Sequence, residues 1–263
     1  MHRRRFTRYG RLGFEVTEDV CFCQTPLVAY FRYSTEIIDR FPTIRGGVIN
    51  ATGLTNTSTP PGLLEAFEAE QQTVRQRLGD TSPSEITSLA AWRSAFSAFG
   101  VKPTQYRNAA EALLRRLSKQ GSVPSINTLV DMANLVSLRY QLPIAVFDQR
   151  SVAGATTVRF ASGDERFTDL GSDSISHPEP GEVVFVDDEG VVSARRWCWR
   201  QSTQSAARSS TAHALITVEG QHPDARTDTT RATNDLIGLL SEHQPQAHLT
   251  SAILSPDSPQ FPP

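Results

Sequence analysis

The sequence predicts an α+β protein, and two observations indicate this class. Apolar residues recur at helical spacing through most of the first half of the chain, up to Pro143. After Pro143 the period changes to two, which is typical of half-buried strands. The chain has 263 residues, of which 38% are hydrophobic, so it can bury one sizeable core and still carry polar extensions.

Three helices are expected in the first half, each with start or stop signals. The second has the clearest start, because Ser82-Pro83-Ser84-Glu85 combines a cap residue, a proline at the first position and a capping-box glutamate. Glycines end the second and third helices. The expected ranges are residues 61–78, 82–99 and 108–120.

Residues 125–148 predict a fourth helix, ended by Pro143, and then a short buried strand. The apolar face of this helix comprises Ile126, Leu129, Val130, Ala133 and Val136. Asn127, Asp131 and Asn134 sit at i, i+4 and i+7, so they form one polar stripe. Amide side chains are poor choices for an exposed helix face. The stripe therefore indicates hydrogen bonding either to neighbouring backbone or to a ligand, and the pattern alone favours neither.

The strands expected in the second half cover residues 156–160, 182–186, 191–199 and 211–219. Two of them have polar faces. On residues 211–219, one face holds Ala212, Ala214, Ile216 and Val218, and the other holds Thr211, His213, Leu215, Thr217 and Glu219. On residues 191–200, Arg196 and Arg200 share one face, and Trp197 and Trp199 share the other. A polar strand face either meets water or lines a pocket, and water is the commoner case.

Composition and motifs exclude several function classes. The net charge of −2 and a pI near 6.3 argue against the broad positive field of a non-specific nucleic-acid binder, although a local patch can still contact RNA. No apolar run is long enough to span a membrane. The three cysteines lack C-x-x-C spacing, which indicates reduced thiols in a cytoplasmic protein. Phosphate-binding loops, H-E-x-x-H and G-x-S-x-G are absent, so we expect neither a metal nor a cofactor.

The chain divides into four expected regions. A flexible basic N-terminus covers residues 1–20, and one domain covers residues 21–222. A C-terminal helix is expected at residues 223–243. The tail, residues 244–263, is rich in Ser, Pro and Gln, which predicts disorder.

An ordered set of motifs resembles one family. The chain reads IN-x-x-VD-x-x-N at residues 126–134, P-x-x-x-FD at residues 143–148, V-R-x-A at residues 158–161 and VEG at residues 218–220. Trp197 is a further matching position. This set resembles the freestanding form of the B3/B4 domain of the bacterial phenylalanine–tRNA synthetase beta subunit. The resemblance implies a barrel-like mixed β-sheet flanked by helices on one side.

The resemblance also implies a function. In that family the domain hydrolyses misacylated tRNA and removes a wrong amino acid from the 3′ end. We therefore expect an RNA-associated domain that takes the aminoacylated tRNA end, with its amino-acid moiety as ligand, and hydrolyses the ester in trans. An aminoacyl ester is already activated, so a positioned water can suffice without a protein nucleophile. The alternative is a module that retains the editing fold and binds an amino acid or a tRNA end without turnover.

The expected site follows residue by residue from the resemblance. Glu219 matches the glutamate that recognises the polar end of the amino acid. Ala145 stands where the family has an editing histidine, which argues against the family's tyrosine-editing mechanism here. Arg196 and Arg200 replace a glycine-rich segment, which suggests either a different or smaller ligand or an arginine that holds a carboxylate or phosphate. The expected substrate-binding residues are Glu219, Asn127, Arg196, Arg200, Thr217 and His213. The expected pocket supports are Asp131, Asn134, Asp148 and Arg159. Neither DNA nor a membrane is an expected partner.

Overall fold

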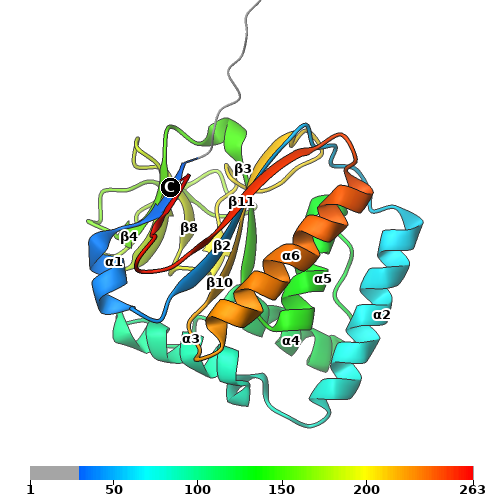
Figure 1. Cartoon of the computed structure of the whole chain (residues 1–263). Helices are drawn as coiled ribbons and strands as arrows, with labels where there is room; N and C mark the ends of the chain where they lie inside the picture. Colours follow the sequence, from blue (N-terminus) through cyan, green and yellow to red (C-terminus); the bar gives the residue numbers. More distant parts are fainter. Residues whose placement is uncertain (1–29, 263) are drawn as a thin grey trace, which may run out of the picture.

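The computed structural model describes residues 30–262, which combine helices and strands as predicted (Figure 1). The helices are α1 (Thr35–Arg40), α2 (Pro61–Leu78), α3 (Thr87–Ala98), α4 (Ala109–Gln120), α5 (Thr128–Tyr140) and α6 (Ala225–His243), with short 3-10 helices at Pro83–Glu85 and Gln149–Ser151. The strands are β1 (Phe31–Tyr33), β2 (Arg45–Thr52), β3 (Ile144–Asp148), β4 (Thr156–Phe160), β5 (Phe167–Thr168), β6 (Ile175–Ser176), β7 (Val183–Val186), β8 (Val192–Arg195), β9 (Arg200–Gln201), β10 (His213–Gly220), β11 (His248–Leu254) and β12 (Gln260–Phe261). The flexible N-terminus predicted for residues 1–20 lies outside the described residues.

The strands form two main sheets. A four-stranded antiparallel sheet has the order β11-β2-β10-β3. A six-stranded sheet has the order β12-β1-β4-β7-β8-β9, in which β1 and β4 pair in parallel and the other neighbours are antiparallel. A small two-stranded ribbon, β5–β6, is a separate sheet that contacts β8 of the six-stranded sheet. The α+β class is confirmed, and the strands that we expected in a barrel-like sheet are divided between these two sheets without closing into a barrel.

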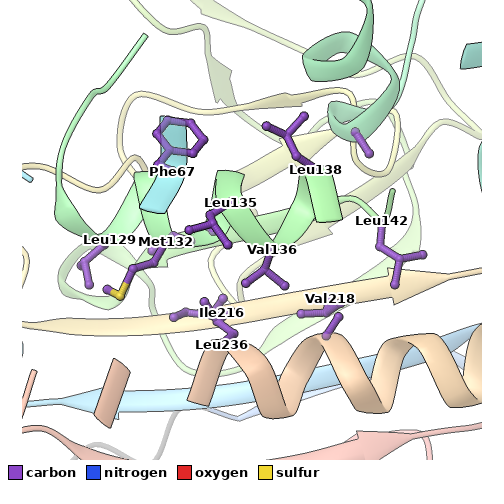
Figure 2. Packing of buried hydrophobic residues seen from close by; sticks show 14 of the residues in the cluster. Phe67, Leu129, Met132, Leu135, Val136, Leu138, Leu142, Ile216, Val218 and Leu236 are labelled. Carbon is purple, nitrogen blue, oxygen red and sulfur yellow. The ribbon is translucent and has the colours of Figure 1, made fainter. Parts of the chain in front are cut away.

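Strand β10 separates two hydrophobic cores. Ala214, Ile216 and Val218 face the core beneath α5 and α6, and Figure 2 shows Ile216 and Val218 beside Val136 of α5 and Leu236 of α6. Leu215 faces the second core, which lies between the two sheets. This is the predicted two-residue alternation, and burying each such aliphatic side chain contributes roughly 1.5–3 kcal/mol. The same alternation directs Thr217 and Glu219 into the space between the sheets.

The observed helices agree with the predicted ranges, except for the start of α3 and the membership of the apolar face of α5. The predicted start of the second helix at residues 82–85 is wrong, because these residues form a 3-10 turn and Ile86 is extended (ψ 128°) before α3 begins. Ser82 Oγ bonds to Ser84 Oγ at 2.7 Å and caps nothing. Ile126 is 62% exposed and not part of the buried face, because the helix begins after it, at Thr128.

The disordered tail predicted for residues 244–263 is also wrong. Strand β11 pairs with β2 along its whole length, from His248 opposite Thr52 to Leu254 opposite Gly46, and β12 pairs with β1. Most of β11 is exposed or half-buried, so backbone hydrogen bonds to β2 hold it more than apolar burial does. A helix, α6, occupies the range expected for one before the tail. In the described part of the chain, no helix has the length and apolar character to cross a membrane.

The crossing of α6 over β2 generates a first prediction. A Cβ added at Gly47 would lie 1.9 Å from Thr233 Oγ1 of α6, so Gly47→Ala must push the two elements apart. We expect the free energy of unfolding to fall by about 1–3 kcal/mol, the usual range for overpacking. Urea unfolding followed by circular dichroism measures the change.

Gly238, which lies on α6 as Thr233 does, is the matched control. An added Cβ there meets no atom within 4 Å, so Gly238→Ala should raise the free energy of unfolding by about 0.5–1 kcal/mol through helix propensity. Equal effects of the two alanines would contradict the packing argument.

Candidate functional site

A cavity of about 70 Å³ lies where β3 and β10 of one sheet face β7 and β8 of the other. Its wall is mainly apolar and includes Phe147, Phe185 and Trp197. Thr217 and Glu219 enter it from β10, and Arg200 and Gln201 reach it from β9. A water needs about 10–15 Å³ of such space, so the cavity holds a few waters or one small organic group.

Glu219 is the central polar side chain of this cavity and is 2% exposed. The Tyr33 hydroxyl donates to its Oε1 at 2.7 Å, and Trp197 Nε1 donates to the same oxygen at 3.0 Å. Within residues 30–262 the carboxyl forms no ion pair, and both hydrogen bonds end on Oε1. Oε2 is therefore available to a group inside the cavity.

Burial raises the pKa of Glu219 to about 7, although the hydrogen bonds from Trp197 and Tyr33 act in the opposite direction. At neutral pH this carboxyl exists in both protonation states, so Oε2 can donate or accept a hydrogen bond. Burial, together with the nearby Glu219, also raises the pKa of Tyr33 and of the Cys198 thiol well above their ordinary values. Both groups therefore stay neutral beside the carboxyl.

The contact between Tyr33 and Glu219 depends on a glycine in the neighbouring strand. Gly46 of β2 is paired with Glu219 of β10, and a Cβ on Gly46 would lie 2.3 Å from the Tyr33 hydroxyl oxygen. Only glycine leaves room for the phenol to cross β2 and reach the carboxyl.

The strand predicted at residues 191–199 ends early, and this correction shapes the site. Strand β8 stops at Arg195, and Arg196 and Trp197 have φ values of 46° and 60°, in the left-handed region. Left-handed backbone costs a residue other than glycine roughly 1–2 kcal/mol. The turn breaks the alternation, so Trp197 is fully buried against Glu219 while Trp199 stays half-buried. Trp197 also packs edge-on against Phe41 at a ring-centre distance of 5.0 Å.

The predicted arginines lie at the outer edge of the cavity. The Arg196 guanidinium lies 4.0 Å from the ring centre of Tyr106 and 4.6 Å from that of Trp199. It does not line the cavity itself. Arg200 does, lying 4.8 Å from the Trp199 ring centre and pairing with Asp169 at 2.6 Å.

The other predicted substrate-binding residues divide by position. Thr217 lines the cavity beside Glu219. His213 is exposed at the opposite end of β10 and does not line it. Asn127 does not line it either, because its side chain caps α5: Oδ1 accepts from the Val130 amide at 3.0 Å.

The four predicted pocket supports do not line the cavity, and three of them hold other loops. Asp131 accepts hydrogen bonds from the Thr59 hydroxyl and the Ile126 amide, so it ties the start of α5 to the loop before α2. Asp148 accepts from the Thr211 hydroxyl at 2.6 Å, and Arg159 pairs with Glu165. Asn134 is half-buried on α5. Within residues 30–262, no three His, Cys, Asp or Glu side chains gather as metal ligands.

Sequence reasoning missed Tyr33 and Cys198 and did not place Trp197 in the site. Trp197 had a signal, because it is one of the positions that carry the family resemblance. Tyr33 had none, because it reaches Glu219 only through the pairing of β1 with β4 and the closeness of the two sheets. Cys198 lines the cavity through the unpredicted turn.

The buried carboxyl generates a second prediction. The pKa of Glu219 is raised from an ordinary 4.5 to about 7, so the folded state binds more protons than the unfolded state between these pH values. The stabilisation is fully present below pH 4.5 and is lost as the pH rises through 7, amounting to at most about 3 kcal/mol. Glu219→Gln cannot ionise and should escape this loss. Urea unfolding of both proteins across this pH range should show the Gln variant gaining on the wild type. A difference that is constant with pH would contradict the raised pKa.

The chain is similar to known proteins in sequence and in structure. The family model described as B3/4 domain matches residues 91–240. The chain is 31% identical over 105 residues to the phenylalanine–tRNA ligase beta subunit of Fusobacterium nucleatum, an alignment that covers 40% of this chain and 13% of that subunit. A crystal structure of an N-terminal fragment of the phenylalanyl-tRNA synthetase beta-subunit from Pyrococcus horikoshii superposes with a TM-score of 0.43 and 11% identity, covering 85% of this chain and 53% of that one. The family model covers more than half of the residues of this chain. The chain therefore belongs to the B3/4 domain family.

Proposed function

We propose that this protein hydrolyses aminoacyl-tRNA in trans, with the aminoacyl group held in the cavity beside Glu219. The observation that carries the proposal is the buried Glu219 carboxyl, which lacks an ion-pair partner within residues 30–262 and meets a mainly apolar cavity. Buried charges and polar groups normally find partners inside the protein, so an open Oε2 favours a ligand. The similarity to a phenylalanine–tRNA ligase beta subunit supports tRNA as the carrier of that ligand.

The proposed reaction needs little from the protein beyond positioning. A water held in the cavity attacks the carbonyl carbon of the ester, the bond to the ribose oxygen breaks, and the ribose hydroxyl leaves with a proton from that water. Holding the ester beside the water removes much of the entropic barrier. Glu219 Oε2 accepts a hydrogen bond from the polar end of the amino acid, and the Thr217 hydroxyl lies beside it on the same strand.

The size of the cavity limits the amino acid. Pockets for drug-sized ligands measure about 300–1,000 Å³, and this one measures about 70 Å³. Phe147, Phe185 and Trp197 fill the space that a large side chain would need. The proposed substrate therefore carries a small side chain.

A binding module without turnover is the second candidate function. Ala145 lines the cavity where the family resemblance places a histidine, so this chain lacks the imidazole that could move protons at that position. The same Glu219 contact would then hold a free amino acid or a charged tRNA end.

A deacylation screen separates the two candidates. Wild type and Glu219→Ala are incubated with a panel of tRNAs charged with radiolabelled amino acids, and the released amino acid is counted. We expect wild type to hydrolyse esters of small amino acids and Glu219→Ala to be slower by about 10–100-fold, as for a lost hydrogen bond to a charged group. His213→Ala, at the exposed end of the same strand, is the control and should match wild type. Ligand binding with no hydrolysis above the buffer blank would favour the binding module.

Filling the cavity gives a further prediction. Ala145 lines it and pairs with Thr217 across β3 and β10, so Ala145→Leu places extra carbons in the space for the ligand. We expect hydrolysis or ligand binding to fall by at least about 10-fold, with a melting temperature equal to wild type or higher, because cavity filling tends to stabilise. Ala69→Leu on the exposed face of α2 is the control for composition. Unchanged activity of Ala145→Leu would show that the ligand binds elsewhere.

A further inference from the structure

Two segments far apart in the sequence meet at the outer edge of the cavity. The Ala109 amide, at the start of α4, donates to the Cys198 carbonyl at 2.8 Å, and both residues line the cavity. Just before and after them, the rings of Tyr106 and Trp199 pack at a centre distance of 4.9 Å and an interplanar angle of 80°. The edge of the cavity is therefore built from aromatic rings held by a backbone hydrogen bond.

Arginines are layered on these rings. Arg196 lies over both Tyr106 and Trp199, and Arg200 lies over Trp199 with 45% of its side chain exposed. Among residues 30–262, Arg200 pairs only with Asp169, whose side chain is itself 36% exposed. Such an exposed pair contributes little and is easily replaced. Alternating guanidinium and aromatic planes that continue to the surface are the kind of platform on which nucleobases stack.

Positive charge is concentrated beside the same rings. The buried Glu111 carboxylate is shared by Arg115 at 2.8 Å, Arg93 at 3.0 Å and Arg107 at 3.8 Å. One carboxylate cannot neutralise three guanidinium groups, so this cluster keeps an excess of positive charge in a chain whose net charge is −2. Arg107 Nε is buried without a hydrogen-bond partner, while 40% of the side chain is exposed. Of the acidic groups nearby, Glu182 pairs with Arg195 at 2.8 Å and, at the longer distance of 3.7 Å, with Arg196, so two guanidinium groups share this carboxylate as well.

We infer that Tyr106, Arg107, Arg196, Trp199 and Arg200 form a docking strip for single-stranded RNA at the mouth of the cavity. Bases stack on the Trp199–Arg200 platform, and Arg107 contacts a backbone phosphate. The inference rests on the proposed function in one respect: the strand that docks here carries the aminoacyl group that enters the cavity. Unlike the proposed function, the inference also predicts that the strip binds an RNA strand that carries no aminoacyl group.

Binding of an RNA that carries no aminoacyl group tests the strip independently of hydrolysis. The probe is a short single-stranded RNA with a 5′ fluorescein, and fluorescence anisotropy gives its dissociation constant between about 50 and about 200 mM salt. We expect Trp199→Ala to weaken binding by about 10-fold, in the range of one lost base stack, and Trp199→Phe to retain most of the affinity. Arg107→Gln should lower the slope of log K against log salt by about 0.7, the value for one phosphate on a single strand. Thermal melts confirm that each variant is folded.

Arg231→Gln is the matched control. Arg231 is exposed on α6, which covers the opposite face of the four-stranded sheet (Figure 1), and the substitution removes the same charge. The inference is overturned if the RNA does not bind at low salt, or if Arg231→Gln changes the salt slope as much as Arg107→Gln. It is also overturned if folded Trp199→Ala binds like wild type. If the RNA binds as expected but wild type hydrolyses no charged tRNA, or Glu219→Ala hydrolyses as fast as wild type, the result counts against the proposed function and not against the strip.

Discussion

The structure depends on burying the Glu219 carboxyl with no ion-pair partner among residues 30–262. A buried carboxylate is costly unless hydrogen bonds or protonation compensate, and here both operate: two donors meet Oε1, and burial raises the pKa to about 7. Each donor comes from a different part of the chain, Tyr33 from β1 and Trp197 from the turn after β8. The single carboxyl therefore joins the four-stranded sheet to the six-stranded sheet. Gly46 is constrained by the same contact, because any side chain there would displace the phenol.

Much of the fold could be predicted because its signals are local. The Asn108 side chain caps the start of α4, and Gly121, which can adopt left-handed backbone, ends it. The alternation of residues along β10 likewise predicts which side chains face each of the two cores. The tail could not be predicted, because β11 is stabilised by its pairing with β2, a contact between residues far apart in the sequence. The composition of the tail correctly indicates that it is polar, but a polar segment can still pair as a strand with the edge of a sheet.

The site was predicted in part, for a related reason. Glu219 and Thr217 follow from strand alternation, once the polar face is known to meet the other sheet and not water. The Asn127–Asp131 pair shows the opposite outcome. Both side chains bond to nearby backbone and hydroxyl groups, which was one of the two interpretations left open by the stripe. Short polar side chains near a helix start satisfy its free amides first, so the local explanation takes precedence over a ligand.

The turn at Arg196 and Trp197 links the cavity to the arginine–aromatic surface outside it. In a regular strand, residues two apart point to the same side, so Trp197 and Trp199 would share a face. Two consecutive left-handed residues separate them: Trp197 goes inward to Glu219, and Trp199 stays at the mouth under Arg200. Neither Arg nor Trp favours this backbone, and their side chains compensate by packing, Trp197 in the core and Arg196 between two rings. This backbone conformation costs energy and at the same time shapes both the inner wall and the outer edge of the cavity. That is the arrangement that the proposed ligand, contacted from both sides, would require.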